Sequence, residues 1–307
     1  MQDSMITRDI HAFLAFARGA APDFGPATAR AAFLVAPDGF ALAEQSAQDN
    51  VYMADAAAFD AQRASMQHRD LQRAISAVLP TVCFAGDPAT PDALFPNNVF
   101  GTAAGRAVIG RMRHPVRQRE AARSDIRGFF ADVLDRQEID LSAQEHPCEL
   151  TGALVIDRAR GLGFCGLSER CDEVGARLMH EAFGLRATLL FDLAPGEYHT
   201  NVVLAVLAGR AVVVCPRGFA DPAVPTAIAG LYAPHAVVCD DAEHQAFVGN
   251  CIALSAGTVW MSADAGAALS DAHRRQLLSS GFIVETVALE AIEAAGGSLR
   301  CCIGEVY

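Results

Sequence analysis

The sequence carries an internal repeat, and this repeat constrains the fold more than any other feature. Three glycines at expected turns, Gly161, Gly209 and Gly257, are each 48 residues apart, and Gly105 stands 56 residues before the first of them. Around each glycine the apolar runs predict two strands, then a helix and a third strand. Self-similarity at such a period is typical of structures built from repeated units.

A second series of positions repeats with nearly the same period. Polar residues begin the first expected strand of successive units, with spacings of 51, 50, 51 and 51 residues: Asn98, Glu149, His199, Asn250 and Cys301. If the units close into a ring, equivalent positions converge on its axis. The repeat therefore predicts that a carboxylate, an imidazole and a thiol meet in one central site, with coincidence among the chosen spacings as the alternative.

The repeat leads to a prediction of the whole architecture. We predict an α/β fold, a five-bladed α/β propeller of pseudo-fivefold ββαβ repeats, in which the C-terminal strands complete the N-terminal unit. Residues 1–30 are expected as a lead-in segment with a short helix at Ile10–Phe16, and residues 31–307 as a single catalytic domain. The longest expected helices are Ala54–Val78, Arg119–Leu134, Asp172–Phe183 and Asp271–Ser280.

Composition excludes several classes of partner. Of the 307 residues, 52% are apolar and 20% charged, which is ordinary for a globular protein with a large core. The net charge of −12 argues against nucleic-acid binding. No signal peptide is evident, and no apolar run approaches the ~20 residues that span a bilayer. Nine cysteines without repeated C-x-x-C spacing favour free thiols, so we expect a cytoplasmic protein without a membrane partner.

The last dozen residues contain a candidate nucleophile. Gly296 and Gly297 permit unusual backbone conformations, and Arg300 precedes Cys301 and Cys302. A neighbouring cation favours the thiolate, the nucleophilic form of cysteine. If residues 298–306 form a strand, only one of the two thiols faces a given site, because side chains alternate. The alternative is a pair of structural cysteines in the core.

Two other residues of the repeated series complete a catalytic constellation. Glu149 begins an apolar strand, where an ionised carboxylate needs a partner, and His199 could be that partner. Cysteine, histidine and an orienting carboxylate together are typical of an activated thiol with general acid–base help. A lone histidine is more often structural. No paired C-x-x-C or H-x-x-x-H spacing supports a metal, and no metal or cofactor is expected.

Short motifs throughout the chain resemble the guanidine-modifying superfamily. This superfamily includes arginine deiminase, dimethylarginine dimethylaminohydrolase, succinylarginine dihydrolase and the amidinotransferases, and its fold is a five-bladed α/β propeller. The resemblance covers about Phe33 to Tyr307 and is greatest to a bacterial hydrolase-like branch associated with citrulline utilisation. The motifs are Pro-Asp-Ala-Leu-Phe-Pro-Asn-Asn (91–98), Glu-x-Thr-Gly-Ala-Leu-Val (149–155), Gly-Leu-Ser-Glu-Arg (166–170), Tyr-His-Thr-Asn-Val (198–202), Phe-Val-Gly-Asn (247–250) and Gly-Gly-Ser-Leu-Arg-Cys (296–301).

The resemblance implies roles for individual residues. Cys301 resembles the nucleophile that attacks the guanidinium carbon, His199 the general acid–base, and Glu149 the carboxylate that orients this histidine. Arg170 matches the arginine that binds the α-carboxylate of the substrate. Arg117 or Arg119 matches a second such arginine. The remaining substrate-binding candidates are Asp92, Asn97, Asn98 and Asn201.

Departures from the family pattern bear on the substrate. Asn98 and Asn201 stand where the deiminases carry aspartate, while Leu150 stands where many relatives have glycine and Ala36 where they have arginine. Losing two carboxylates weakens the attraction for a permanent cation, whereas amides suit a neutral urea. Alternatively, both asparagines only cap local turns. These differences favour a ureido substrate or a two-step hydrolysis.

The predicted function is that of a cysteine-dependent hydrolase. It would act on the guanidino or ureido C–N bond of an arginine- or citrulline-like amino acid, through a covalent adduct on Cys301, and release ammonia. This small molecule is the expected partner, and the oligomeric state stays open, with a homodimer as one candidate. Two alternatives are an amidinotransferase and a catalytically silent binding propeller, the latter disfavoured by intact Cys301, His199 and Glu149.

Overall fold

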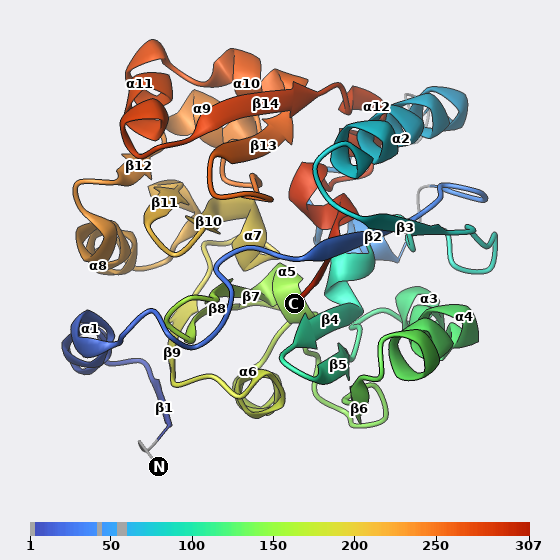
Figure 1. Cartoon of the computed structure of the whole chain (residues 1–307), viewed down its shortest axis with the longest axis horizontal. Helices are drawn as coiled ribbons and strands as arrows, with labels where there is room; N and C mark the ends of the chain where they lie inside the picture. Colours follow the sequence, from blue (N-terminus) through green and yellow to red (C-terminus); the bar gives the residue numbers. More distant parts are fainter. Residues whose placement is uncertain (1–3, 42–44, 54–59) are drawn as a thin grey trace.

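The strands of this chain pair in small groups and not in one continuous sheet. The computed structural model describes residues 4–41, 45–53 and 60–307, and their strands form five separate sheets, so the fold is mixed α/β. Figure 1 shows these sheets arranged around the middle of the molecule, with the longer helices toward the outside.

Four of the sheets share one pattern of pairing. In each, the first strand runs antiparallel to the second, and the second runs parallel to the third. Because β15 pairs with β2, the C-terminal strand completes the first sheet, as the repeat predicts. The strands are β15 (Gly304–Val306), β2 (Ala31–Val35) and β3 (Thr81–Phe84); β4 (Phe100–Ala103), β5 (Arg106–Ile109) and β6 (Gln137–Asp140); β7 (Leu154–Asp157), β8 (Leu162–Leu167) and β9 (Ala187–Asp192); and β10 (Leu204–Leu207), β11 (Ala211–Val214) and β12 (Ala236–Val238).

Helices connect the parallel strands, which cannot be joined by a tight turn. In α6, Asp172 caps the first turn by accepting a hydrogen bond from Gly175 N at 2.7 Å. Gly184 ends the helix in the left-handed conformation, with φ 64°, which glycine adopts most readily. The crossover helices are α2 (Ala61–Ser76), α4 (Ser124–Gly128) with the π-helical turn η5 (Phe129–Val133), α6 (Glu173–Phe183), α8 (Ala223–Tyr232) and α11 (Asp271–Ser279).

The fifth sheet contains only β13 (Thr258–Ser262) and β14 (Ile283–Val287), which are parallel. The repeat predicts that the unit around Gly257 begins with a strand at residues 251–254. This prediction is wrong, since among these residues only Ile252 forms a bridge, to Trp260. The reason is the turn that follows: Ser255 Oγ accepts hydrogen bonds from the main-chain N–H groups of Gly257 and Thr258. The chain therefore bends before a longer ladder forms.

Two expected helices differ from the structure. The helix expected over residues 119–134 is split into η4 (Arg119–Ala122), α4 and η5. Arg123 has extended backbone angles, φ −62° and ψ 95°, and its guanidinium donates to Ala85 O at 2.8 Å, so a tertiary contact overrides the helical pattern. The helix expected at residues 54–78 is observed as α2, and its residues 54–59 lie outside the described part of the chain.

The N-terminal residues add to the third sheet. β1 (Met5–Thr7) runs parallel to β9, and α1 (Ile10–Gly19) buries Phe13 and Ala17 against the core. No helix in the described ranges is long and apolar enough to cross a membrane. The remaining short helices are η1 (Ser46–Asp49), α3 (Pro115–Gln118), η6 (Pro216–Gly218), α9 (Asp241–Gln245), α10 (Ala263–Ala268) and α12 (Glu290–Glu293).

Short helical turns precede the first strands, and this corrects the expected positions of the repeated polar residues. Glu149 and His199 stand immediately before helical turns and not on strands, and Cys301 lies inside one. The strand expected at residues 298–306 is accordingly shortened to β15. The turns are η3 (Pro96–Asn98), α5 (Leu150–Ala153), α7 (Thr200–Val203) and η7 (Leu299–Cys302), and Figure 1 shows α5 and α7 near the centre of the molecule.

Candidate active site

A small cavity lined mostly by buried residues lies where these helical turns meet. Its volume is about 30 Å³, room for only a few water molecules. Residues that are distant in the sequence therefore converge on one site. The predicted site residues that line it are Asp92, Asn98, Arg117, Arg170, His199 and Cys301.

A buried carboxylate–imidazole pair stands at the side of this cavity. Glu149 Oε2 lies 2.8 Å from His199 Nε2, and the two side chains are 0% and 1% exposed. The same carboxylate accepts a hydrogen bond from the main-chain N–H of Arg113 at 3.0 Å and lies 3.4 Å from Arg170 Nη1. These three partners hold Glu149 in one orientation.

The surroundings set the charge of this pair. Burial alone would raise the pKa of Glu149, but Arg170, His199 and Arg117 together hold the pKa of this carboxyl well below its usual range. Burial lowers the pKa of His199, and Glu149 only partly offsets this. A neutral His199 that donates from Nε2 to an ionised Glu149 leaves Nδ1 as a free acceptor. Consistently, Nδ1 is buried and lacks a hydrogen-bond partner among the described residues.

Cys301 occupies the cavity, whereas Cys302 does not. Asn250 Nδ2 donates to Cys301 Sγ at 3.4 Å, and Asn201 Oδ1 lies 3.9 Å from the same sulfur. Burial raises the pKa of the Cys301 thiol, and the hydrogen bond from Asn250 offsets part of this rise. Cys302 Sγ instead lies 3.6 Å from Ser298 O. The two thiols diverge because they follow each other in a helical turn, and the strand alternation expected for them is wrong.

Arg170 reaches the cavity but is already paired with a carboxylate that the sequence did not indicate. Its Nε donates to Asp49 Oδ2 at 2.9 Å, and its Nη2 pairs with Asp49 Oδ1 and donates to Ser46 O at 3.1 Å. The guanidinium also lies over the Tyr198 ring, 5.4 Å from its centroid. Asp49 contacts His114 as well, with 3.1 Å between Oδ1 and Nε2. Asp49 had no motif or repeat position that could have revealed it.

A second buried arginine also lines the cavity. Arg117 forms a two-pronged pair with Glu120, at 2.8 and 2.9 Å, and its Nη2 donates to Phe95 O at 3.0 Å. Of the two arginines considered from the sequence, Arg119 is exposed and lies outside the cavity. Asp92 is buried and accepts a hydrogen bond from Ser46 Oγ at 2.5 Å.

The three asparagines differ in their positions. Asn98 lines the cavity, and its Oδ1 is buried without a partner among the described residues, as is Nδ2 of Asn201. Asn97 lies outside the cavity lining, where its Nδ2 donates to Thr151 Oγ1 at 3.4 Å. Unpaired buried polar atoms are costly, so Asn98 and Asn201 have capacity for a ligand.

Two further residues of the site were not among the predicted site residues. Gly152 packs so closely that a Cβ there would lie 2.5 Å from Asn98 Oδ1 and 2.9 Å from His199 Nδ1. Asn250 holds Cys301 as described above, and its place in the repeated series was the signal that could have found it. The described residues contain no group of three His, Cys, Asp or Glu side chains placed to hold a metal ion.

This chain is a guanidine-modifying enzyme of the amidinotransferase-like superfamily, and the buried thiol, imidazole and carboxylate that its mixed α/β fold brings together agree with that class. Residues 36–307 match the family described as N,N dimethylarginine dimethylhydrolase, eukaryotic. The chain belongs to this family, and it is therefore a hydrolase of C–N bonds other than peptide bonds. The narrower resemblance to a citrulline-utilisation branch stays a prediction.

Individual relatives agree with this assignment. The chain is 26% identical over 217 residues to N(G),N(G)-dimethylarginine dimethylaminohydrolase of Mycobacterium tuberculosis, which covers 71% of this chain and 67% of that protein. Solved structures that share the fold include the following two. The N-terminal domain of ArgZ, an arginine dihydrolase from cyanobacteria, has a TM-score of 0.78 at 18% identity, covering 90% of this chain and 97% of that chain. A dimethylarginine dimethylaminohydrolase adduct with S-methyl-L-thiocitrulline has a TM-score of 0.67 at 17% identity, covering 91% and 100%.

Proposed function

We propose that this protein hydrolyses the guanidino or ureido C–N bond of an arginine- or citrulline-like amino acid through a covalent adduct on Cys301. The observation that carries the proposal is the cavity itself. It places Cys301 beside the buried Glu149–His199 pair and beside the unpartnered acceptors Asn98 Oδ1 and His199 Nδ1. A guanidino or ureido group carries several N–H donors on one planar carbon, which suits such a set of acceptors.

The proposed reaction has two halves that return the enzyme unchanged. His199 accepts the thiol proton, and Cys301 Sγ attacks the planar carbon to form a C–S bond. His199 then gives this proton to the leaving nitrogen, whose C–N bond breaks. In the second half His199 takes a proton from water, and the resulting hydroxide attacks the same carbon. The C–S bond breaks, and Cys301 regains its proton. Glu149 stabilises the imidazolium that forms in both halves.

The charges around the acceptors support activity on neutral as well as cationic groups. Two amides stand where a carboxylate would favour a cation: Asn98 lines the cavity, and Asn201 Oδ1 lies 3.9 Å from Cys301 Sγ. Asp92 is the carboxylate among the cavity-lining site residues. An amide oxygen accepts a hydrogen bond from urea as readily as from guanidinium. We therefore extend the proposed substrates from guanidino compounds of the arginine type to ureido compounds of the citrulline type.

Arg170 is proposed to bind the α-carboxylate of the substrate in exchange for Asp49. Its Nε and Nη2 form the planar fork that suits a carboxylate, and Asp49 occupies this fork now. The cavity is also far smaller than an amino acid. Substrate binding is thus expected to move Asp49 and the η1 turn that carries it away from Arg170. Arg117 is the second candidate for the amino-acid end.

We also propose that the five sheets are the blades of a five-bladed α/β propeller and that residues 31–307 form one catalytic domain. Hydrogen bonds between successive central turns support this. Thr151 Oγ1 donates to Asn97 O at 3.0 Å, Thr200 Oγ1 to Ala153 O, and Asn250 Nδ2 to Asn201 O at 2.8 Å. The η7 turn then packs against η3, which returns the series to its beginning.

The test is a substrate panel combined with covalent trapping. Ammonia or amine release is measured with arginine, methylated arginines, acylated arginines and citrulline, and the protein is incubated separately with a haloacetamidine. We expect turnover of at least one of these compounds and a single adduct that fragmentation mass spectrometry places on Cys301. The matched control is Cys302→Ser, which should give the same adduct. No turnover of any compound, together with no adduct on Cys301, would rule out the proposal.

A further inference from the structure

A second and larger cavity lies apart from the candidate active site. Its volume is about 340 Å³, within the ~300–1,000 Å³ range of small-molecule sites. It is formed by the β4–β5 hairpin, the end of α6, the segment before β2 and the C-terminal residue. The side chains that matter for binding are Arg30, Arg106, Arg136 and Arg158, with Phe24 and Tyr307 among the aromatic walls.

The arginines of this cavity gather without Asp or Glu side chains paired to them. Arg106 donates to Ala182 O at 3.2 Å and Arg158 to Thr102 O at 2.8 Å, while Arg136 donates to an oxygen of Tyr307, the last residue, at 2.6 Å. None of the four forms an ion pair with an Asp or Glu side chain of the described residues, although the chain has 36 acidic and 24 basic residues. Like charges held together in this way favour an anion between them.

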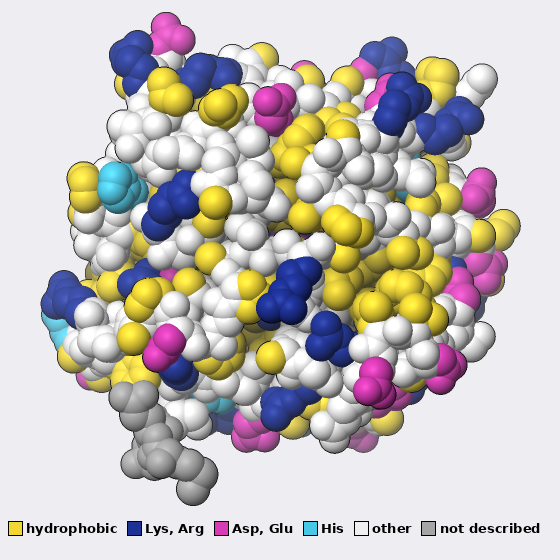
Figure 2. Space-filling view, in the orientation of Figure 1, with side chains coloured by type: hydrophobic (Ala, Val, Ile, Leu, Met, Phe, Trp, Pro, Cys, Tyr) yellow, Lys and Arg dark blue, Asp and Glu magenta, His cyan; other side chains and the backbone are white. Residues whose placement is uncertain are grey.

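One of these side chains is a buried cation, and another has binding capacity that the protein does not use. Arg158 is only 7% exposed and forms no ion pair with an Asp or Glu side chain of the described residues, and such burial of a cation is costly. Nε of Arg136 is buried without a hydrogen-bond partner among the described residues. Both side chains line the cavity. Figure 2 shows several basic side chains toward the middle of the face where Figure 1 places the C-terminus.

Aromatic rings form the rest of the wall. Arg158 lies over the Tyr307 ring at 4.2 Å from its centroid and 5.3 Å from that of Phe183. Gly184 also lines the cavity, and a Cβ at this left-handed position would lie 3.3 Å from Arg106 Nη1. A site that combines guanidinium groups with aromatic faces suits a ligand with an anionic group next to a flat apolar one.

We propose that this cavity is a second binding site, which takes a small organic anion with a doubly charged group, such as a phosphate ester, attached to an aromatic ring. Guanidinium groups recognise phosphate oxygens in a planar, two-pronged geometry. The ring would lie against the aromatic wall. Binding at this site does not require that the proposed hydrolysis takes place.

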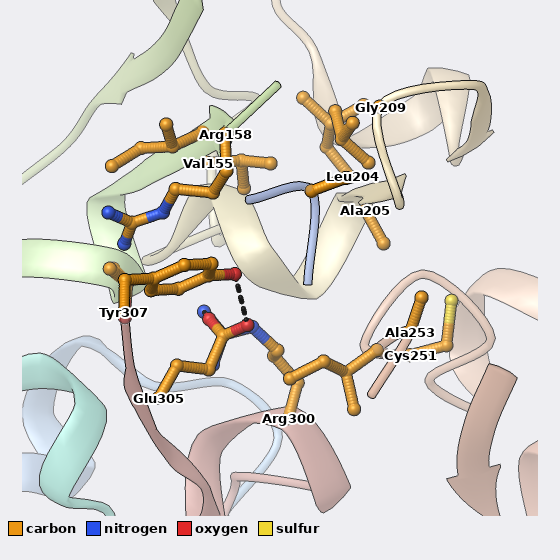
Figure 3. A pocket seen from close by; sticks show the side chains of 15 residues that line it. Val155, Arg158, Leu204, Ala205, Gly209, Cys251, Ala253, Arg300, Glu305 and Tyr307 are labelled. Carbon is orange, nitrogen blue, oxygen red and sulfur yellow. Dashed lines mark hydrogen bonds and ion pairs between the residues drawn. The ribbon is translucent and has the colours of Figure 1, made fainter. Parts of the chain in front are cut away.

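A chain of contacts joins the second site to the candidate nucleophile. Tyr307 Oη donates to Glu305 Oε1 at 2.7 Å, and Arg300 Nη2 donates to Glu305 Oε2 at 2.8 Å. Arg300 N then donates to Asn250 Oδ1 at 3.0 Å, and Asn250 holds Cys301 Sγ. Figure 3 shows Arg158, Tyr307, Glu305 and Arg300 in succession in an adjoining cavity that shares Arg158 and Tyr307 with the second site. The bound anion is therefore proposed to alter the reactivity of the Cys301 thiol.

Binding is tested by calorimetric titration of the full chain with phenyl phosphate and, separately, with inorganic phosphate. Phenyl phosphate is expected to bind saturably and more tightly than phosphate, and less tightly as salt is added. Arg106→Gln and Arg136→Gln are expected to raise the Kd about tenfold or more, because each removes a charge-assisted hydrogen bond. The matched control is Arg275→Gln, an exposed arginine on α11, which should leave the Kd unchanged.

Four results would count against the proposal. Absence of saturable phenyl phosphate binding, or equal binding in the Arg106 and Arg136 variants while circular dichroism shows both folded, overturns the site. Inorganic phosphate that binds as tightly as phenyl phosphate overturns the role of the aromatic wall. An unchanged rate of Cys301 alkylation at saturating phenyl phosphate overturns the coupling. The calorimetric titrations measure binding and do not depend on hydrolytic activity. Failure of the proposed function would be seen in the substrate panel and not in these titrations.

Discussion

Replacing Glu149 with glutamine removes one negative charge beside His199 and changes almost nothing in shape. The carboxylate accepts a hydrogen bond from His199 at 2.8 Å and another from Arg113 N at 3.0 Å. A glutamine side chain could keep only part of these hydrogen bonds. Arg170 would retain Asp49 as its partner. The fold is therefore expected to survive, while the imidazolium form of His199 loses its main support.

The expected size of the effect follows from the hydrogen bond. A bond to a charged group contributes about 1.5–3 kcal/mol and a neutral one about 0.5–1.5 kcal/mol, so the change removes roughly 1–2 kcal/mol from the imidazolium. One pKa unit corresponds to about 1.4 kcal/mol. Glu149 raises the pKa of His199, and its loss should therefore lower that pKa by roughly one unit. We expect kcat to fall about tenfold or more by the same arithmetic.

Stability should change with a defined dependence on pH. The folded pKa of Glu149 lies below its ordinary value of 4.5, so its ionised form stabilises the native state above about pH 4.5. Above that pH, the parent protein should have a free energy of unfolding about 1–3 kcal/mol higher than Glu149→Gln, because the variant loses a charged buried partner. This difference should decline progressively as the pH falls from about 4.5 toward the folded pKa. Urea unfolding between pH 3 and 7, roughly the range over which carboxylates titrate, measures it.

The kinetic assay is the pH profile of kcat/KM for the best substrate of the panel. We expect its acidic limb, which reports protonation of His199 in the free enzyme, to move to lower pH in Glu149→Gln. The matched control is Asp157→Asn, another fully buried carboxylate, which accepts from Arg160 Nε at 2.7 Å and Tyr232 Oη at 2.9 Å. It should lose stability without moving the limb. Parent-like turnover and an unmoved limb in Glu149→Gln would show that the carboxylate serves the fold alone.

Cys301→Ser should abolish turnover while Cys302→Ser keeps most of it, because only Cys301 lines the cavity; equal losses in two folded variants would contradict the assignment. The double variant Asn98→Asp/Asn201→Asp should shift kcat/KM toward arginine and away from citrulline by a factor corresponding to roughly 1.5–3 kcal/mol, one charge-assisted hydrogen bond. A parent that processes arginine and ignores citrulline, with no shift in the variant, would refute the charge argument. Gly152→Ala places a methyl group 2.9 Å from His199 Nδ1. It should lower the free energy of unfolding by about 1–3 kcal/mol and remove most of kcat. Full activity of this variant would show that His199 can move aside.

The period of the sequence determined which residues would meet. Glu149 and His199 are 50 residues apart and still form a direct hydrogen bond, because both hold the same place in successive ββαβ units. The pairing of β15 with β2 followed from the same repeat. Such features can be predicted from the sequence because each depends on a local pattern of apolar periodicity and turn glycines. This pattern recurs in every unit.

Only the tertiary structure determined which polar groups of the site pair with one another. Asp49 and Arg170 are 121 residues apart and belong to no common repeat position, so nothing local indicated their pair. The helical turn at Cys301 likewise depends on packing, and it replaced the expected strand without changing which thiol faces the cavity. Whether two distant segments form a contact depends on which groups the whole fold brings within hydrogen-bond distance. No periodic pattern in the sequence indicates such a contact.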